Sequence, residues 1–176
     1  MSTIAIVSDS TASLSDEYVR AHGIHVVPLY LRIDGATYRD GVDITSSAFY
    51  ERLPRCNVLP TTSQPSAGDF VQLYQALADQ GATSIVSVHL SSGISGTVNS
   101  ARLAAEQMAG LPVEIVDTQC AVGAHHLAVE AGVAARAAGA DVGQVAAVMR
   151  AASAQQRTLF VVDTLEYLYK GGRIGG

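Results

Sequence analysis

The chain has 176 residues, of which 48% are hydrophobic, and its net charge is −5. This length suits one complete domain of ~100–200 residues, and the apolar content excludes an intrinsically disordered chain. A nucleic-acid-binding surface is also excluded, because it needs clustered Lys and Arg, and the 11 basic residues form no group larger than a pair.

The N-terminal segment indicates a cytoplasmic protein. Residues 1–7 contain neither a basic region nor a small-residue cleavage site, and no apolar run approaches the ~20 residues that span a bilayer. Cys56 and Cys120 lie far apart, which predicts two reduced thiols. His125 and His126 are adjacent and would point in different directions on a helix, so we expect no metal site.

The first half of the chain predicts strands and helices in alternation. The expected elements are a strand over 3–8, a helix from the caps at 13–16 to Gly23, one strand over 24–33, a turn at 34–35, a return strand near 37–38, and a short helix from Thr45 to Pro54.

The second half continues the alternation. It predicts a helix over 67–80, a strand over 84–90, helices over 97–109, 121–138 and 142–154, strands over 113–116 and 159–162, and a helical turn over 165–170. Strands separated by helices of this length predict an α/β fold, with a mainly parallel sheet and helices on both faces.

Two hydroxyl-rich loops each lead into a predicted helix. Residues 60–65 read Pro-Thr-Thr-Ser-Gln-Pro, and residues 91–97 read Ser-Ser-Gly-Ile-Ser-Gly-Thr. Hydroxyl and backbone N–H groups at a helix start bind small anions, although helix capping alone also explains such residues. The second loop and Asp9 each follow a strand, and ligands of open parallel sheets bind at that edge.

Asp9 and Arg173 are charged residues that are candidates for a functional role. The pattern allows Asp9 to be a metal ligand, a catalytic acid or a helix-approach cap. Arg173 lies among glycines, where its guanidinium can reach a carboxylate or phosphate, or can remain a solvated charge.

The loops carry no recognised catalytic signature. Residues 93–96 miss the G-x-S-x-G pattern by one position, and Thr97 follows Gly96 without the Lys of a phosphate-binding loop. No His, Lys or Glu is predictably within reach of Ser92 or Ser95. We therefore expect a binding protein, with a hydroxyl-dependent phosphotransferase or acyl hydrolase, or a chain without activity of its own, as alternatives.

Several segments in a fixed order resemble the DegV family of bacterial fatty-acid-binding proteins. They are residues 8–11, 60–65, 90–97, 116–118 and 170–174. The resemblance implies a fold similar to dihydroxyacetone-kinase-like α/β domains. It also implies a carrier in phospholipid metabolism that needs no cofactor. Such a carrier binds one long-chain fatty acid and presents the carboxylate to a separate fatty acid kinase, which makes the acyl phosphate.

The same resemblance implies the site residues. The carboxylate ligands match Thr62 and Ser95, with Ser63, Ser92 and Arg173 as possible additional contacts. Residues 1–156 are expected to form the head-group domain, and residues 157–176 to begin a second α/β domain that is largely missing. The family's continuation closes the acyl tunnel and supplies a His to the carboxylate network.

Overall fold

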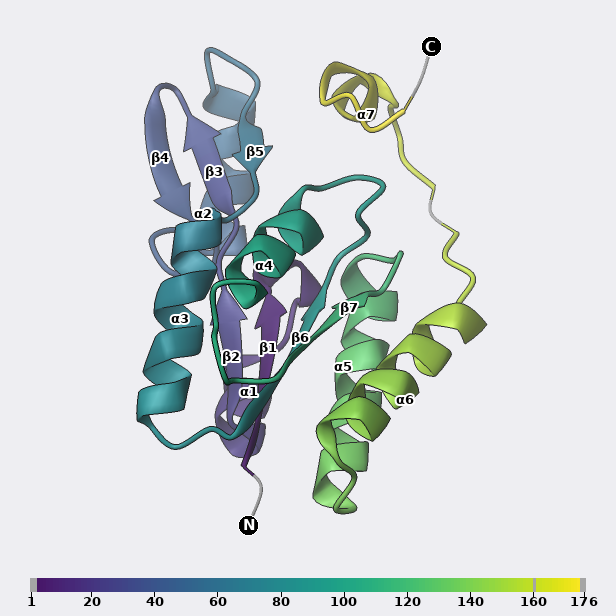
Figure 1. Cartoon of the computed structure of the whole chain (residues 1–176). Coiled ribbons are helices and arrows are strands. Elements are labelled where there is room, and N and C mark those ends of the chain that lie inside the picture. Colours follow the sequence, from purple (N-terminus) through teal and green to yellow (C-terminus); the bar gives the residue numbers. More distant parts are fainter. Residues whose placement is uncertain (1–2, 160, 175–176) are drawn as a thin grey trace.

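A computed structural model describes residues 3–159 and 161–174 (Figure 1). The elements in chain order are β1 (Ile4–Asp9), the 3-10 turn η1 (Ser10–Ala12), α1 (Asp16–His22), β2 (Ile24–Val27), β3 (Tyr30–Ile33), β4 (Ala36–Arg39), α2 (Ser46–Arg52), the 3-10 turn η2 (Leu53–Arg55), β5 (Thr61–Ser63), α3 (Ala67–Asp79), β6 (Ser84–His89), α4 (Thr97–Ala105), β7 (Val113–Asp117), α5 (Val122–Ala137), α6 (Val142–Gln155) and α7 (Glu166–Lys170).

The main sheet has four parallel strands in the order β2-β1-β6-β7. Side chains of a strand alternate between the two faces, and in β1 they divide between two buried clusters. Ile4 and Ile6 pack with apolar residues of α5 and α6, whereas Ala5 and Val7 pack with residues of α3 and α4. Figure 1 shows these helix pairs on opposite sides of the sheet. The predicted α/β fold with both faces covered is confirmed.

The prediction of one strand over 24–33 is wrong. The chain leaves the main sheet after β2 and enters a second sheet as β3. Pro28 lies at the crossing and has no N–H to donate to a ladder, and the N–H of Leu29 donates to Ser10 Oγ at 3.1 Å. Proline and this side-chain acceptor therefore end the first ladder.

The second sheet is antiparallel, in the order β4-β3-β5. Its hairpin turn is confirmed, because Asp34 and Gly35 have φ angles of 47° and 87°, as a type I′ turn requires. The prediction of a loop at Thr61–Ser63 is wrong, since these residues form β5 and pair with β3, with Thr62 opposite Leu31. This pairing fixes the direction of the hydroxyl side chains.

Two further predictions fail near helix ends. Helix α4 ends at Ala105 instead of residue 109, because the chain turns there and brings Met108 into the core. Leu159, Val161 and Val162 do not form a strand, and residue 160 lies outside the described residues. Leu159 and Val161 are 95% and 99% exposed, so they pack against no sheet. The helical turn at α7 is confirmed.

Helices α5 and α6 pack closely at Gly132. A Cβ added there would lie 1.9 Å from Met149 Cε and 2.7 Å from its Cγ. We expect Gly132→Ala to lower the free energy of unfolding by about 1–3 kcal/mol through overpacking, although alanine is the better helix former.

Urea denaturation of both a test and a control variant measures this effect. Gly123→Ala is the matched control in the same helix, because an added Cβ there would have no neighbour within 4 Å. This control should be neutral or slightly stabilising. Equal stability changes in the two variants would contradict the packing argument.

Across residues 3–159 and 161–174, no helix combines the length and the hydropathy that a membrane span requires.

Candidate functional site

The two hydroxyl-rich segments meet in the fold. Gly96 precedes α4, and a Cβ added to it would lie 2.7 Å from Gln64 Nε2, just after β5. The side chain of Gln64 therefore lies against the backbone of the second segment. A side chain at position 96 would have to displace the amide of Gln64, so Gly96 favours this contact between the segments that carry Thr62 and Ser95.

Thr62 lies exposed in β5 and contacts Arg173. Arg173 Nη2 donates to Thr62 Oγ1 at 3.0 Å, and its Nη1 donates to the carbonyl of Gly171 at 2.6 Å. In Figure 1, α7 lies at the same end of the molecule as β3, β4 and β5. Because Arg173 occupies a lone pair of Thr62, the hydroxyl proton stays available for a ligand.

Ser63 follows Thr62 in the strand. Successive side chains of a strand point to opposite faces of the sheet, so Thr62 and Ser63 do not face the same ligand while β5 is intact. The structure therefore brings Arg173, but not Ser63, to Thr62.

Ser95 lies at the N-terminal end of α4. Its Oγ accepts the N–H of Thr97 at 3.3 Å and lies 2.9 Å from Thr97 Oγ1. The N-cap residue of α4, Gly96, makes no side-chain capping bond. Ser95 Oγ thus accepts the first N–H group of α4, and the partial positive charge of the helix start favours an anion beside it.

Ser92 holds the loop in place. Its Oγ donates to Asp117 Oδ2 at 2.5 Å, and its N–H donates to Asp117 Oδ1 at 3.2 Å. The single hydroxyl proton is thus engaged by a carboxylate at the end of β7. In this arrangement Ser92 fixes the loop and has no proton left for a second anion.

A buried polar network lies directly behind this loop. Asp9 Oδ2 accepts the N–H of Leu90 at 3.0 Å and lies 3.0 Å from His89 Nδ1. His89 Nε2 lies 2.7 Å from Ser87 Oγ, which accepts the Tyr74 hydroxyl at 2.7 Å. The contact between Asp9 and the Leu90 N–H confirms that the loops after β1 and β6 lie close together. The polar side chains of Asp9, Tyr74, Ser87 and His89 all have hydrogen-bond partners.

The donors of this network all point toward Asp9. Burial raises the pKa of Tyr74, which keeps its hydroxyl protonated as the first donor. Tyr74 donates to Ser87. In the tautomer in which His89 donates from Nδ1 to Asp9, His89 Nε2 is an acceptor, and Ser87 can donate to it. Burial alone would raise the pKa of Asp9, but the hydrogen bonds that it accepts, above all the one from His89, lower it to about 2. Asp9 is therefore an ionised carboxylate in the core.

His125 approaches the same carboxylate from α5. Its Nε2 lies 3.1 Å from Ser8 Oγ and 3.2 Å from the Val88 carbonyl, while its Nδ1 lies 3.9 Å from Asp9 Oδ1. Burial lowers the pKa of His125, which favours the neutral ring. His126 instead lies 3.5 Å from Glu130, so the two histidines diverge as predicted.

Sequence reasoning missed this network, although one signal was visible. Ser87 and His89 are polar residues in β6, a strand whose six residues are all buried. The order Asp9, His89, Ser87 matches a hydrolytic triad, yet the three residues are 0% exposed. No substrate reaches the Ser87 hydroxyl, so the network is structural. In the described ranges no group of three His, Cys, Asp or Glu could hold a metal ion.

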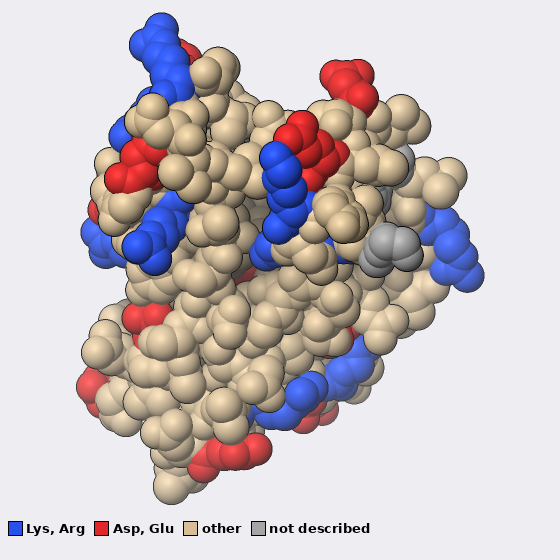
Figure 2. Space-filling model, turned by 90° about the horizontal axis from the view of Figure 1, so that it is seen from above, with Lys and Arg blue, Asp and Glu red and all other residues tan. Residues whose placement is uncertain are grey.

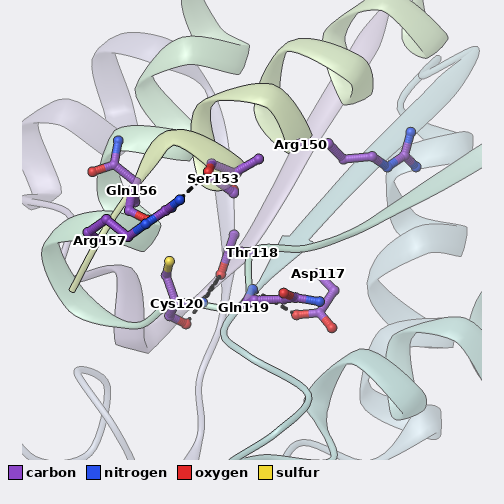
Figure 3. A pocket seen from close by; sticks show the side chains of 9 residues that line it. Asp117, Thr118, Gln119, Cys120, Arg150, Ser153, Gln156 and Arg157 are labelled. Carbon is purple, nitrogen blue, oxygen red and sulfur yellow. Dashed lines mark hydrogen bonds between the residues drawn. The ribbon is translucent and has the colours of Figure 1, made fainter.

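A pocket of about 360 Å³ lies on the other side of Asp117, between β7 and the end of α6 (Figure 3). Figure 3 shows Arg150 and Arg157 on its rim and Cys120 beside Thr118. Eight of its nine lining residues carry polar or sulfur-containing side chains. An acyl chain needs apolar walls, so this pocket does not suit a lipid tail.

The face seen in Figure 2 carries blue and red side chains that are scattered among neutral surface. The blue side chains form no extended patch on this face.

Comparison with known proteins identifies the family. A family model described as "Uncharacterised protein, DegV family" matches residues 3–176. A DegV domain-containing protein of Deinococcus radiodurans is 40% identical over 174 residues, which cover 99% of this chain and 61% of that protein.

Two solved structures show the same fold. A DegV family protein of Thermus thermophilus, described by its fatty acid binding, has a TM-score of 0.90 and 38% identity, over 99% of this chain and 61% of that one. DegV of Bacillus subtilis, described as a fatty acid binding protein, has a TM-score of 0.92 and 33% identity, over 98% and 61% of the two chains. The chain thus spans about 61% of the length of these relatives. It belongs to the DegV family.

Proposed function

We propose that this protein binds a long-chain fatty acid and holds its carboxylate between Thr62 and Ser95. The observation that carries the proposal is the meeting of the two hydroxyl segments at Gln64 and Gly96. Each hydroxyl oxygen is supported by another donor, Arg173 for Thr62 and the Thr97 N–H for Ser95. Relatives described as fatty-acid-binding proteins support the same ligand class.

Neutral hydroxyls suit a carrier that hands its ligand to an enzyme. They bind a carboxylate without a full positive charge, so an oxygen keeps enough electron density to attack a phosphoryl group. We propose a separate fatty acid kinase as the partner, with phosphoryl transfer in the cytoplasm. Within the described part of the chain, neither Ser92 nor Ser95 has a hydrogen bond to a histidine, which argues against a hydrolase.

The acyl tail requires further apolar surface. We propose that residues 1–156 form the head-group domain and that residues 157–176 begin a second α/β domain. Leu159 and Val161 are almost fully exposed, and Tyr167 and Tyr169 are 50% and 63% exposed, as expected of residues that pack against a further unit. The greater length of the relatives supports this division.

Lipid extraction tests the proposed function. Denaturing extraction of the purified protein, followed by mass spectrometry, should release a C16–C18 fatty acid. Titration with palmitic acid should then show saturable binding to the delipidated protein. Absence of both the extracted acid and palmitate binding would refute the proposal.

An esterase assay separates the carrier from the enzyme alternative. We expect no turnover of p-nitrophenyl acetate, because no exposed serine hydroxyl among the described residues is hydrogen-bonded to a histidine. Turnover that disappears in the Ser92→Ala variant would favour the hydrolase instead.

A further inference from the structure

The geometry points to Thr97 as a positioning residue that directs the Ser95 hydroxyl toward the ligand carboxylate. This inference rests on the proposed function. Thr97 is the first residue of α4 and is 0% exposed, whereas Ser95 is partly exposed. The two hydroxyl oxygens lie 2.9 Å apart, which is hydrogen-bonding distance, and either atom can be the donor.

The bound ligand decides the direction of this hydrogen bond. A hydroxyl has one proton and can accept two hydrogen bonds. When Ser95 gives its proton to a carboxylate, it can meet Thr97 only as an acceptor. The Thr97 hydroxyl must then donate to Ser95, because Ser95 has no second proton. The other hydrogen bond between the two residues also runs toward Ser95, from the Thr97 N–H to Ser95 Oγ. Ser95 is thereby held from behind by two donors of one residue.

The second ligand hydroxyl is held in the same manner. Arg173 donates to Thr62 Oγ1, which leaves the Thr62 proton free to point outward. Donation to a hydroxyl oxygen also strengthens the hydrogen bond that the same hydroxyl makes to its acceptor. Thr97 and Arg173 thus have the same role, because each donates a hydrogen bond to a hydroxyl that binds the ligand. Thr97 is a buried neutral donor, whereas Arg173 is an exposed cation.

Burial of Thr97 makes this role specific. Among the described residues, Ser95 is the one hydrogen-bond partner of Thr97 Oγ1. Its hydroxyl is therefore not needed to join α4 to any other element. The methyl group fills buried space and serves folding, whereas the hydroxyl serves Ser95. The two parts of the side chain can be removed separately.

Palmitic acid titration of three variants tests the inference. Thr97→Val keeps the shape of the side chain without the hydroxyl, and it should weaken binding about 2- to 10-fold, the range for one neutral hydrogen bond. Thr97→Ser keeps the hydroxyl without the methyl group and should bind within about 2-fold of the wild type. A purely structural role would instead make Thr97→Ser at least as harmful as Thr97→Val. Ser153→Ala, which loses a buried hydroxyl bonded to Met149 in α6, should leave binding unchanged.

A double-mutant cycle completes the test. In the Ser95→Ala background, Thr97→Val should have no further effect on affinity. Thr97→Ala replaces Thr97→Val if the latter does not fold, since alanine is well tolerated in helices. If Ser95→Ala weakens binding but neither Thr97→Val nor Thr97→Ala does, this inference is overturned and the proposed function still stands. Failure of the wild type to bind palmitic acid would overturn both.

Discussion

Asp9→Asn is expected to destabilise the protein by about 2–6 kcal/mol, because two buried donors would lose their acceptor at a cost of about 1–3 kcal/mol each. Four donors converge on the carboxylate: His89 Nδ1 and the Leu90 N–H on Oδ2, and the Thr11 N–H and hydroxyl on Oδ1. An asparagine side chain has one oxygen and one NH₂ group, so two of these donors would face another donor. Urea denaturation at pH 7 measures the loss.

Asp43→Asn is the matched control. Hydrogen bonds from Arg39 lower the pKa of Asp43 to about 2, the same value as that of Asp9. The Arg39–Asp43 pair is exposed and screened by solvent, so its removal should cost only a small part of the Asp9 effect. Comparable losses in the two variants would show that burial does not set the contribution of Asp9.

The pH dependence of the stability should also report the ionised state of Asp9. The folded pKa of Asp9 is below its usual 3.8, so its stabilisation is complete above that value and is lost as the pH falls toward about 2. The stability gap between the wild type and Asp9→Asn should therefore narrow in that range. Burial lowers the pKa of His125 from 6.5, so stability also decreases as the pH falls below 6.5. A gap that stays constant down to pH 2 would contradict the ionised state of Asp9.

Thr62→Ala and Ser95→Ala should each weaken palmitic acid binding by about 1.5–3 kcal/mol, because each removes a hydrogen bond to a charged group. The corresponding loss of affinity is roughly 10- to 150-fold. Both residues lie at the surface of the fold, so the midpoints of urea denaturation should change little. Fluorescence or calorimetric titration of the delipidated protein provides the affinities.

Thr61→Ala is the control within the same strand. Thr61 precedes Thr62 in β5, and its side chain points to the opposite face of the sheet. Its removal should leave the affinity unchanged. The assignment of the carboxylate ligands fails if Thr62→Ala and Ser95→Ala bind palmitic acid as tightly as the wild type does.

Local signals in the sequence were sufficient to predict most of the elements. The caps at Ser15 and Thr45 and the turn at Asp34 and Gly35 are confirmed, because each depends on residues a few positions apart. The break at Pro28 was missed, since the apolar residues on both sides read as one strand although they enter different sheets.

The site was predictable to a different degree. The proposed ligand hydroxyls, Thr62 and Ser95, lie in two separate sequence motifs. The family resemblance assigned both motifs to one binding site. Arg173 was expected near the site only through that resemblance, because it is 111 positions from Thr62, and the contact between Leu90 and Asp9, which are 81 positions apart, was not expected at all. No local pattern encodes pairs so far apart. The strand state of Thr61–Ser63 likewise depends on β3, which lies in a distant part of the chain.

The order of the donors from Tyr74 to Asp9 also implies that substitutions at the two ends of the network differ in cost. Tyr74→Phe removes only the first donor, and Ser87 can still donate to His89. A change at Asp9 instead removes the acceptor of both His89 Nδ1 and the Leu90 N–H. Tolerance of mutation should therefore be greater at the tyrosine end of this network than at its carboxylate end.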